Sequence, residues 1–197
     1  MMQFSEVIRV LDGVLCHTEE HYARMYRTMM HFFGSADGLR DFPSVVPEMA
    51  SVGTYKCRIV YDSVIREVSF QPYFIRPRHN VLVTHCELFD YSFKYLDRSI
   101  FDDLMRRRDC DDVVIVCDGN ITDSCYANLV FASEEGLFTP ITPLLKGTCR
   151  ERLIREGVVS EREIRVEDLN NFDTVYFINA MMPLYSCGCK TTSLFVG

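Results

Sequence analysis

The stretch "FKYLDRSIFDDL", residues 93–104, places a single lysine between two aromatic residues, directly before a segment with helical periodicity. A lysine that attacks a carbonyl carbon must be a neutral amine, and apolar surroundings favour that form. Phe93 and Tyr95 can provide such surroundings for Lys94. A lysine between aromatic side chains can also be a surface residue whose aliphatic part packs while its ammonium group stays hydrated. The stretch therefore marks Lys94 as a candidate nucleophile that needs support from the rest of the chain.

The composition is that of a globular protein, because 197 residues with 48% hydrophobic residues suffice for one large domain or two small ones. The formal net charge of −7 arises from 28 acidic and 21 basic residues without a long basic run, so we expect no nucleic-acid partner. No window holds the roughly 18 uninterrupted apolar residues that a membrane helix needs, and the first residues lack a secretory pattern. We therefore expect a cytoplasmic protein with no membrane contact.

The nine cysteines are odd in number and mostly lie in apolar, strand-like sequence such as "VVIVCD" at 113–118. This pattern predicts reduced, buried thiols rather than a disulfide framework. Cys187 and Cys189 form a C-x-C pair, but no second pair of ligands follows at zinc spacing. We predict no metal site.

The first half of the chain predicts a small α+β unit. Alternating residues at 4–10 and 14–16 flank a "DG" turn, which indicates a β-hairpin. Residues 19–34 have helical periodicity and end at Gly34, a common residue at a helix C-terminus. The apolar face predicted for this helix consists of Tyr22, Met25, Met29, Phe32 and Phe33. Two strands follow, over 54–62 and 66–75, and Pro77 is expected to close the second.

The second half predicts a strand-rich unit. A strand over 80–88 precedes the lysine stretch, and residues 97–108 predict a helix. A further helix is expected to begin near Thr148. The remaining predicted strands lie at 112–118, 128–133, 137–140, 163–166 and 174–179. No repeat or low-complexity linker is present. Only Pro77 and the change in the pattern of strands and helices suggest a boundary between a small lobe, 1–78, and a second lobe, 79–197, with a cleft between them.

Four separated blocks of sequence carry a family resemblance. These blocks are "FSEVIRVLDGVL" with "HYARM" (4–15 and 21–25), "KYLDR" (94–98), "DSCYAN" (123–128) and "NAMMP" (179–183). Together they resemble the class IV aminotransferases, pyridoxal-phosphate enzymes of fold type IV that include branched-chain and D-amino-acid aminotransferases. Their motifs are most similar to those of aminodeoxychorismate lyase. The blocks occur in the family's order over most of residues 4–186, and the resemblance implies a two-lobed α+β fold.

The resemblance implies a role for each matching residue toward pyridoxal 5'-phosphate. Lys94 is similar to the lysine that holds the cofactor as a Schiff base, and Arg24 to the arginine that binds its phosphate, for which a guanidinium fork is well suited. Gly147, Thr148 and Cys149 resemble the family's turn that receives the phosphate. In such a turn, the backbone N–H groups at the start of the following helix bind the anion. Taken without the family, Arg24 is a solvated helix residue and the Gly-Thr turn marks only a helix start.

The "DSCYAN" and "NAMMP" blocks complete the implied site. Asp123 occupies the position of a family glutamate that holds the pyridine nitrogen, and Asn128 opens the next strand beside the cofactor. Asn179 and Ala180 resemble a second loop that contacts phosphate and substrate. Two alternatives stay open from the residues themselves: Asp123 can be a turn residue that caps backbone amides, and the methionines that follow Ala180 can be core.

The implied function is that of a class IV aminotransferase that acts on an amino acid as a cytoplasmic homodimer. One alternative is an aminodeoxychorismate lyase-type elimination of pyruvate, and another is a non-catalytic protein that keeps the fold. The chain departs from the family in two ways. Asp123 is one methylene shorter than glutamate, and the first lobe lacks residues that longer members have before "FSEVIR" and between the first helix and Lys94.

Overall fold

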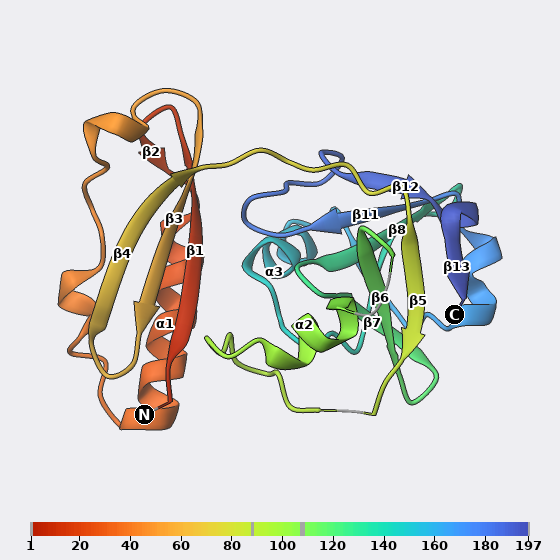
Figure 1. Cartoon of the computed structure of the whole chain (residues 1–197), viewed down its shortest axis with the longest axis horizontal. Helices are drawn as coiled ribbons and strands as arrows, with labels where there is room; N and C mark the ends of the chain where they lie inside the picture. Colours follow the sequence, from red (N-terminus) through yellow and green to blue (C-terminus); the bar gives the residue numbers. More distant parts are fainter. Residues whose placement is uncertain (1, 88, 107–108, 197) are drawn as a thin grey trace. The chain divides into compact units, whose positions relative to one another are not determined.

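The computed structural model describes residues 2–87, 89–106 and 109–196, which fall into two compact units (Figure 1). The N-terminal unit comprises residues up to Phe74 together with Phe93–Asp97. The C-terminal unit comprises Ile75–Ser92 and the residues from Arg98 onward. The chain thus leaves the first unit, enters the second and returns to the first for the five residues around Lys94.

The N-terminal unit is a four-stranded antiparallel sheet in the order β2-β1-β3-β4. Its strands are β1 (Phe4–Leu11), β2 (Val14–Leu15), β3 (Thr54–Tyr61) and β4 (Ile65–Pro72). The predicted hairpin is confirmed, with Asp12 and Gly13 at φ values of 47° and 80°, as a tight two-residue turn requires. β4 ends at Pro72, so the prediction that Pro77 closes this strand is wrong.

Helix α1 (Thr18–Phe33) lies against this sheet and ends at Gly34, as predicted (Figure 1). Gly34 has a φ of 71°, and its N–H donates to the carbonyl of Met30. The predicted apolar face is wrong at Tyr22, which is 44% exposed. The buried face is turned toward His21 and Arg24 instead, because these polar side chains have a buried partner on β1. The core beneath the helix contains Phe4, Ile8, Val10, Met25, Met29, Leu39, Cys57, Ile59 and Tyr61.

The C-terminal unit is built around one mixed sheet in the order β10-β9-β8-β7-β6-β5-β13, with β11 paired to β8 and β12 paired to β11. The pairs β13-β5, β5-β6 and β9-β10 are parallel, and the other pairs are antiparallel. The strands are β5 (Val81–His85), β6 (Asp112–Cys117), β7 (Asn120–Ser124), β8 (Asn128–Ser133), β9 (Gly136–Pro140), β10 (Ser160–Arg162), β11 (Thr174–Ile178), β12 (Gly188–Lys190) and β13 (Leu194–Val196).

Helices α2 (Ser99–Arg106) and α3 (Thr148–Arg155) belong to the C-terminal unit, and both were predicted. Short 3-10 turns complete the chain at Leu39–Asp41, Glu48–Ala50, Val166–Asn171 and Thr191–Ser193. The strand predicted over 163–166 is wrong, since Arg165 forms only an isolated bridge to Asn120 and a 3-10 turn begins at Val166. The ends of two predicted elements, at 88 and at 107–108, lie outside the described residues. The α+β class predicted from the sequence is confirmed.

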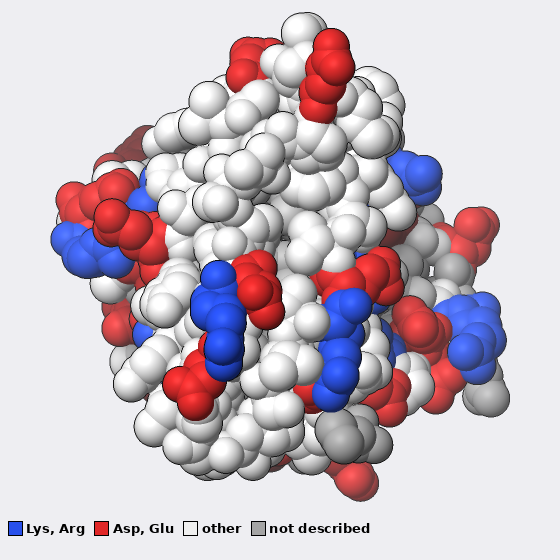
Figure 2. Space-filling model, turned by 90° about the vertical axis from the view of Figure 1, so that its left-hand side faces the viewer, with Lys and Arg blue, Asp and Glu red and all other residues white. Residues whose placement is uncertain are grey.

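Figure 2 shows one face on which the described Lys and Arg side chains are interspersed with Asp and Glu and do not merge into one basic patch. A wide area without charged side chains lies in the upper part of this face, below acidic side chains at its top edge. The distribution agrees with the acidic formal net charge of −7.

Candidate active site

Lys94 is positioned by the edge of β1. The N–H of Ser5 donates to the carbonyl of Lys94 at 2.9 Å, and Phe4 and Tyr95 form an antiparallel bridge. The two aromatic neighbours of the lysine pack on the core of the N-terminal unit: the ring centroid of Phe93 lies 4.8 Å from that of Phe32, and the centroid of Tyr95 lies 5.4 Å from that of Phe4. The lysine, itself half-buried, is therefore carried on a backbone fixed by hydrogen bonds and by aromatic packing on both sides.

Arg24 lies on the buried face of α1 and is only 8% exposed. Its Nε donates to Oε2 of Glu6 at 3.0 Å, its Nη2 contacts Oε1 of the same carboxylate, and Nδ1 of His21 lies 2.9 Å from Oε1. Burial alone would raise the pKa of Glu6, but the charges of Arg24 and His21 and their hydrogen bonds lower it well below its usual range. The interpretation of Arg24 as a solvated helix residue is therefore wrong.

β1 connects the two predicted residues of this unit. Ser5 holds the backbone of Lys94, and the adjacent Glu6 holds the guanidinium of Arg24. Glu6 and His21 were not predicted as site residues, although both lie within the quoted blocks. Their signal in the sequence is weak, because a glutamate in a strand and a histidine on a helix are usually exposed.

Asp123 anchors the site in the C-terminal unit. It lies on β7, is 5% exposed, and accepts hydrogen bonds from Nδ2 of Asn128 at 2.7 Å and from the N–H of Leu145 at 3.0 Å. Burial raises its pKa to about 6, against the effect of these donors and of the Arg150 charge. Asp123 therefore accepts a backbone N–H, as its interpretation as a capping residue predicts. That N–H belongs to Leu145 in the loop before α3, not to the turn that follows Asp123.

Asn128 joins Asp123 to the turn that precedes α3. Its Nδ2 also donates to the carbonyl of Leu145 at 2.8 Å. Gly147 packs so tightly on the same side chain that an added Cβ would lie 2.1 Å from Oδ1 of Asn128. Three of the predicted residues, Asp123, Asn128 and Gly147, are thus brought together, and we call this group with Leu145 the Asp123 cluster.

Helix α3 begins directly after the Asp123 cluster, at Thr148. The first N–H groups of an α-helix lack partners within the helix and point toward anions near its N-terminus. Thr148 and Cys149 are both buried there, and burial raises the pKa of the Cys149 thiol. Cys149 therefore offers its backbone N–H and a neutral side chain at this position.

Arg150 is a third residue of this turn to which the sequence analysis assigned no role. Its side chain is 1% exposed and donates to the carbonyl of Pro140 at 2.9 Å, to Glu161 at 2.5 Å and to Glu151 at 2.7 Å. These contacts fix the first turn of α3 to β9 and β10. The arginine directly follows Gly147, Thr148 and Cys149 in the sequence, and this position was the available signal.

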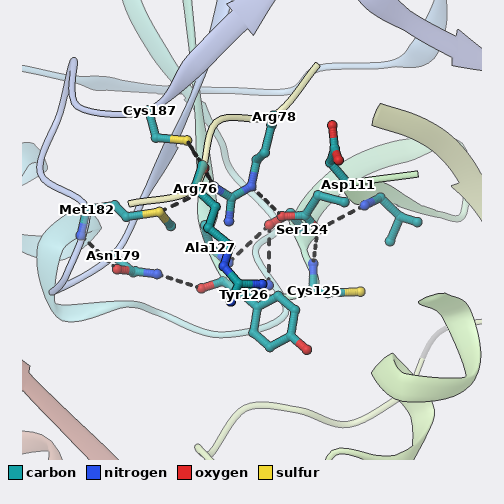
Figure 3. A network of polar contacts seen from close by, with 12 residues as sticks. Arg76, Arg78, Asp111, Ser124, Cys125, Tyr126, Ala127, Asn179, Met182 and Cys187 are labelled. Atoms are coloured by element: carbon teal, nitrogen blue, oxygen red, sulfur yellow. Dashed lines mark hydrogen bonds and ion pairs between the residues drawn. The ribbon is translucent and has the colours of Figure 1, made fainter. Parts of the chain in front are cut away.

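The "NAMMP" loop is held by Asn179, and Figure 3 shows the contacts of this residue with Met182 and Tyr126. Oδ1 accepts the N–H groups of Met181 and Met182 at 2.8 and 2.9 Å, and Nδ2 donates to the carbonyl of Tyr126 at 2.9 Å. Both methionines are buried, which agrees with the interpretation of them as core residues, and Ala180 is half-buried. The loop is thereby joined to the turn that follows Asp123.

That turn, residues 124–127, is also fixed from other directions (Figure 3). The N–H of Cys125 donates to Oδ1 of Asp112 at 3.3 Å, while Oδ2 of Asp112 accepts from Nε of Arg78 at 2.8 Å. Nη2 of Arg98, the last residue of the "KYLDR" block, contacts the carbonyl of Cys125. Side chains from three separate segments therefore set the path of the chain between Asp123 and Asn128.

Comparisons with known proteins identify the family of this chain. The family model of amino-transferase class IV matches residues 92–187. A protein of Haemophilus influenzae described only as uncharacterized is 32% identical over 188 residues, which are 93% of this chain and 100% of that protein. The chain belongs to the class IV aminotransferase family. This enzyme family depends on pyridoxal phosphate, which is the cofactor predicted from the sequence.

Solved structures of this family have the same fold. A candidate 4-amino-4-deoxychorismate lyase from Haemophilus somnus 129PT superimposes with a TM-score of 0.80 at 26% identity, over 93% of this chain and 98% of that one. A hypothetical aminotransferase from Mycobacterium tuberculosis in its PLP-bound form gives a TM-score of 0.72 at 20% identity, over 98% and 81% of the chains. Fold type IV is thereby confirmed, and the match to the H. somnus protein extends over nearly all of both chains.

Within residues 2–87, 89–106 and 109–196, no three His, Cys, Asp or Glu side chains are grouped so that they could hold a metal ion. Among the same residues, no helix is both long and apolar enough to cross a membrane.

Proposed function

We propose that this class IV enzyme is an aminotransferase that acts on an amino acid and uses Lys94 as its covalent attachment point for pyridoxal phosphate. The observation that carries the proposal is the Asp123 cluster. In this cluster the buried carboxylate of Asp123 accepts a hydrogen bond from Asn128, and Asn128 packs against Gly147, directly before the N-terminus of α3. A cofactor with a basic ring nitrogen at one end and a phosphate at the other requires those two features.

The residues of the C-terminal unit fit the cofactor on chemical grounds. A carboxyl group with a pKa near 6 is mostly ionised at neutral pH and can hold a protonated pyridine nitrogen. Gly147 leaves no room for a side chain beside Asn128, so only glycine lets the backbone of the turn lie directly against the residue that holds Asp123. Thr148 and Cys149 would bind the phosphate through their N–H groups, and Asn179 and Ala180 would form the second loop around it.

In the N-terminal unit, Arg24 would bind the phosphate through its guanidinium, whose plane is set by the carboxylate of Glu6. Lys94 would attach the cofactor and later move the proton at the substrate's α-carbon, as a positioned amine can. When bound, the cofactor supplies the electron sink for that proton transfer. Asp123 would keep the ring nitrogen protonated.

An elimination that releases pyruvate is the second candidate. The similarity to the candidate 4-amino-4-deoxychorismate lyase from H. somnus favours it, because that match extends over 98% of that chain. One fold hosts both reactions, so the overall similarity does not choose between them. We favour transamination of a small amino acid, since the compact first lobe offers less surface for a bulky acid. Homodimerisation, and a cytoplasmic location consistent with nine free cysteines, are part of the proposal.

Borohydride reduction of the cofactor-loaded enzyme followed by peptide mapping tests the attachment point. We expect one pyridoxyl adduct, on Lys94, and none in the Lys94→Ala variant. An adduct on Lys56 or Lys146 in the unaltered enzyme would overturn the assignment.

The reaction type is tested by parallel assays. Aminodeoxychorismate is supplied in one, and single amino acids with a keto-acid acceptor are supplied in the others. We expect a new keto acid from at least one amino acid. Rapid pyruvate release from aminodeoxychorismate, with no keto acid from any amino acid, would select the lyase. Inactivity in every assay by a cofactor-loaded protein would favour a non-catalytic role.

A further inference from the structure

Two cysteines meet where the parallel strands β5 and β6 end. His85 and Val116 are in register, and the N–H of Cys86 donates to the carbonyl of Val116 at 3.0 Å, so Cys86 and Cys117 stand next to each other. Their Sγ atoms are 3.4 Å apart. Residues on neighbouring strands have Cα separations of about 5 Å, which lies within the range that a disulfide spans.

The two thiols differ in their access to solvent. Cys117 is 3% exposed, whereas Cys86 is half-buried. Burial, with added effects from Cys86 and the Asp118 charge, raises the pKa of Cys117 to about 12. A disulfide reagent therefore reaches Cys86 first, and Cys117 acts as the second, resolving thiol.

We propose that Cys86 and Cys117 form a reversible disulfide when a low-molecular-weight disulfide such as oxidised glutathione is the oxidant. The bond requires the sulfur atoms to approach by about 1.4 Å, which is within reach of rotation about the side-chain bonds of the two cysteines. The disulfide would link the chain just after β5, from which it continues toward Lys94, to the end of β6. The inference does not depend on the proposed function.

The chemistry balances in two exchange steps. The Cys86 thiolate attacks one sulfur of the oxidant, forms a mixed disulfide and releases one molecule of reduced thiol. Cys117 then loses its proton to solvent and attacks the Cys86 sulfur, which releases the second molecule of reduced thiol. Two protein thiols are oxidised by two electrons, and one small disulfide is reduced to two thiols.

The test uses the full chain in its native state, treated with oxidised glutathione at pH 8, quenched by alkylation with N-ethylmaleimide and mapped without reduction. We expect a Cys86–Cys117 cross-link that reverses with dithiothreitol, and little glutathione left on Cys86. The same treatment in concentrated urea should lower the yield of this cross-link at least tenfold, because the pairing depends on the fold. The proposal would be overturned if peptide mapping of the native protein found Cys86 and Cys117 both alkylated. It would also be overturned if glutathione stayed bound to Cys86.

Three variants define the roles of the two thiols. Cys117→Ser should accumulate glutathione on Cys86 at least tenfold above the unaltered chain, since the resolving thiol is gone. Cys86→Ser should leave Cys117 unmodified. Cys16→Ser, which removes a half-buried cysteine from the N-terminal unit, should form the cross-link as the unaltered chain does. A cross-link yield that falls equally in all three variants would contradict the pairing, and the urea comparison decides the matter if a variant does not fold.

Discussion

Replacing Glu6 by glutamine tests how the N-terminal unit holds Arg24. Glu6 is fully buried and its carboxylate receives Nε of Arg24 at 3.0 Å, with His21 at 2.9 Å. Glu6→Gln keeps the size of the side chain but removes the charge, so a guanidinium that is 8% exposed loses its counter-ion. Removing one partner of a buried ion pair costs about 3–5 kcal/mol. We expect the free energy of unfolding to fall by that amount at pH 7.

The matched control is Glu67→Gln on β4 of the same sheet. Glu67 lies 3.7 Å from Arg58, and both side chains are substantially exposed, at 57% and 34%. Exposed pairs contribute little, so the control should change the free energy of unfolding by no more than about 0.5 kcal/mol. The chain contains no tryptophan, so urea unfolding is best followed by far-ultraviolet circular dichroism. Equal losses in the two variants would refute the reasoning.

The pH dependence gives an independent check with a defined sign. The folded-state pKa of Glu6 is lowered from an ordinary value of 4.5. Its stabilising contribution is therefore complete above pH 4.5 and is lost as the pH falls below that value toward the folded-state pKa. The difference between the unaltered chain and Glu6→Gln should be constant from about pH 5.5 to 7, then shrink by about 1.4 kcal/mol per pH unit below pH 4.5. A difference that grows in acid would contradict the ion pair.

Three other outcomes follow from the candidate site. Asp123→Asn should retain the cofactor, seen by its absorbance, while kcat falls about a hundredfold or more; turnover like that of the unaltered enzyme would leave Asp123 a purely structural residue. Arg24→Ala should raise the cofactor Kd about ten- to a hundredfold, whereas Arg27→Ala on the exposed face of α1 should leave it unchanged in equilibrium titrations. Gly147→Ala should push Asn128 aside and lower the free energy of unfolding by about 1–3 kcal/mol in urea titrations, and a neutral effect would show that the turn can adapt.

The elements that were predicted correctly have a simple pattern in the sequence. β6 is an unbroken apolar run from Val113 to Cys117 that is buried throughout, and α1 buries one face at helical spacing that includes Met25 and Met29. β7, which was not predicted, buries Thr122, Asp123 and Ser124 instead. Polar residues can be buried there because they find partners from elsewhere in the fold, such as the carbonyl of Ile115, which accepts from Oγ1 of Thr122 at 3.0 Å. A strand stabilised by such contacts lacks the pattern of apolar residues from which a strand is predicted.

Contacts between residues that are distant in the sequence also limited the prediction of the candidate site. The family resemblance selected Lys94, Arg24 and Asp123 because they stand in blocks with a fixed order. The groups that hold them, Glu6 for Arg24 and Asn128 with Leu145 for Asp123, come from other elements and depend on distance in space. Asn128 was selected for its place in a block, and its bridging contacts were not foreseen.

Those supporting contacts bear on the shorter side chain of Asp123. A carboxylate on a side chain with one fewer methylene reaches less far, but both of its oxygens accept a hydrogen bond, from Asn128 at 2.7 Å and from Leu145 at 3.0 Å. Such a carboxylate is fixed in place and costs little reorganisation when charge develops nearby. Because burial still raises its pKa to about 6, a positive partner such as a protonated ring would favour its ionised form more strongly than solvent does. The shorter side chain is thus compatible with holding the ring nitrogen, provided that the ring lies closer to β7.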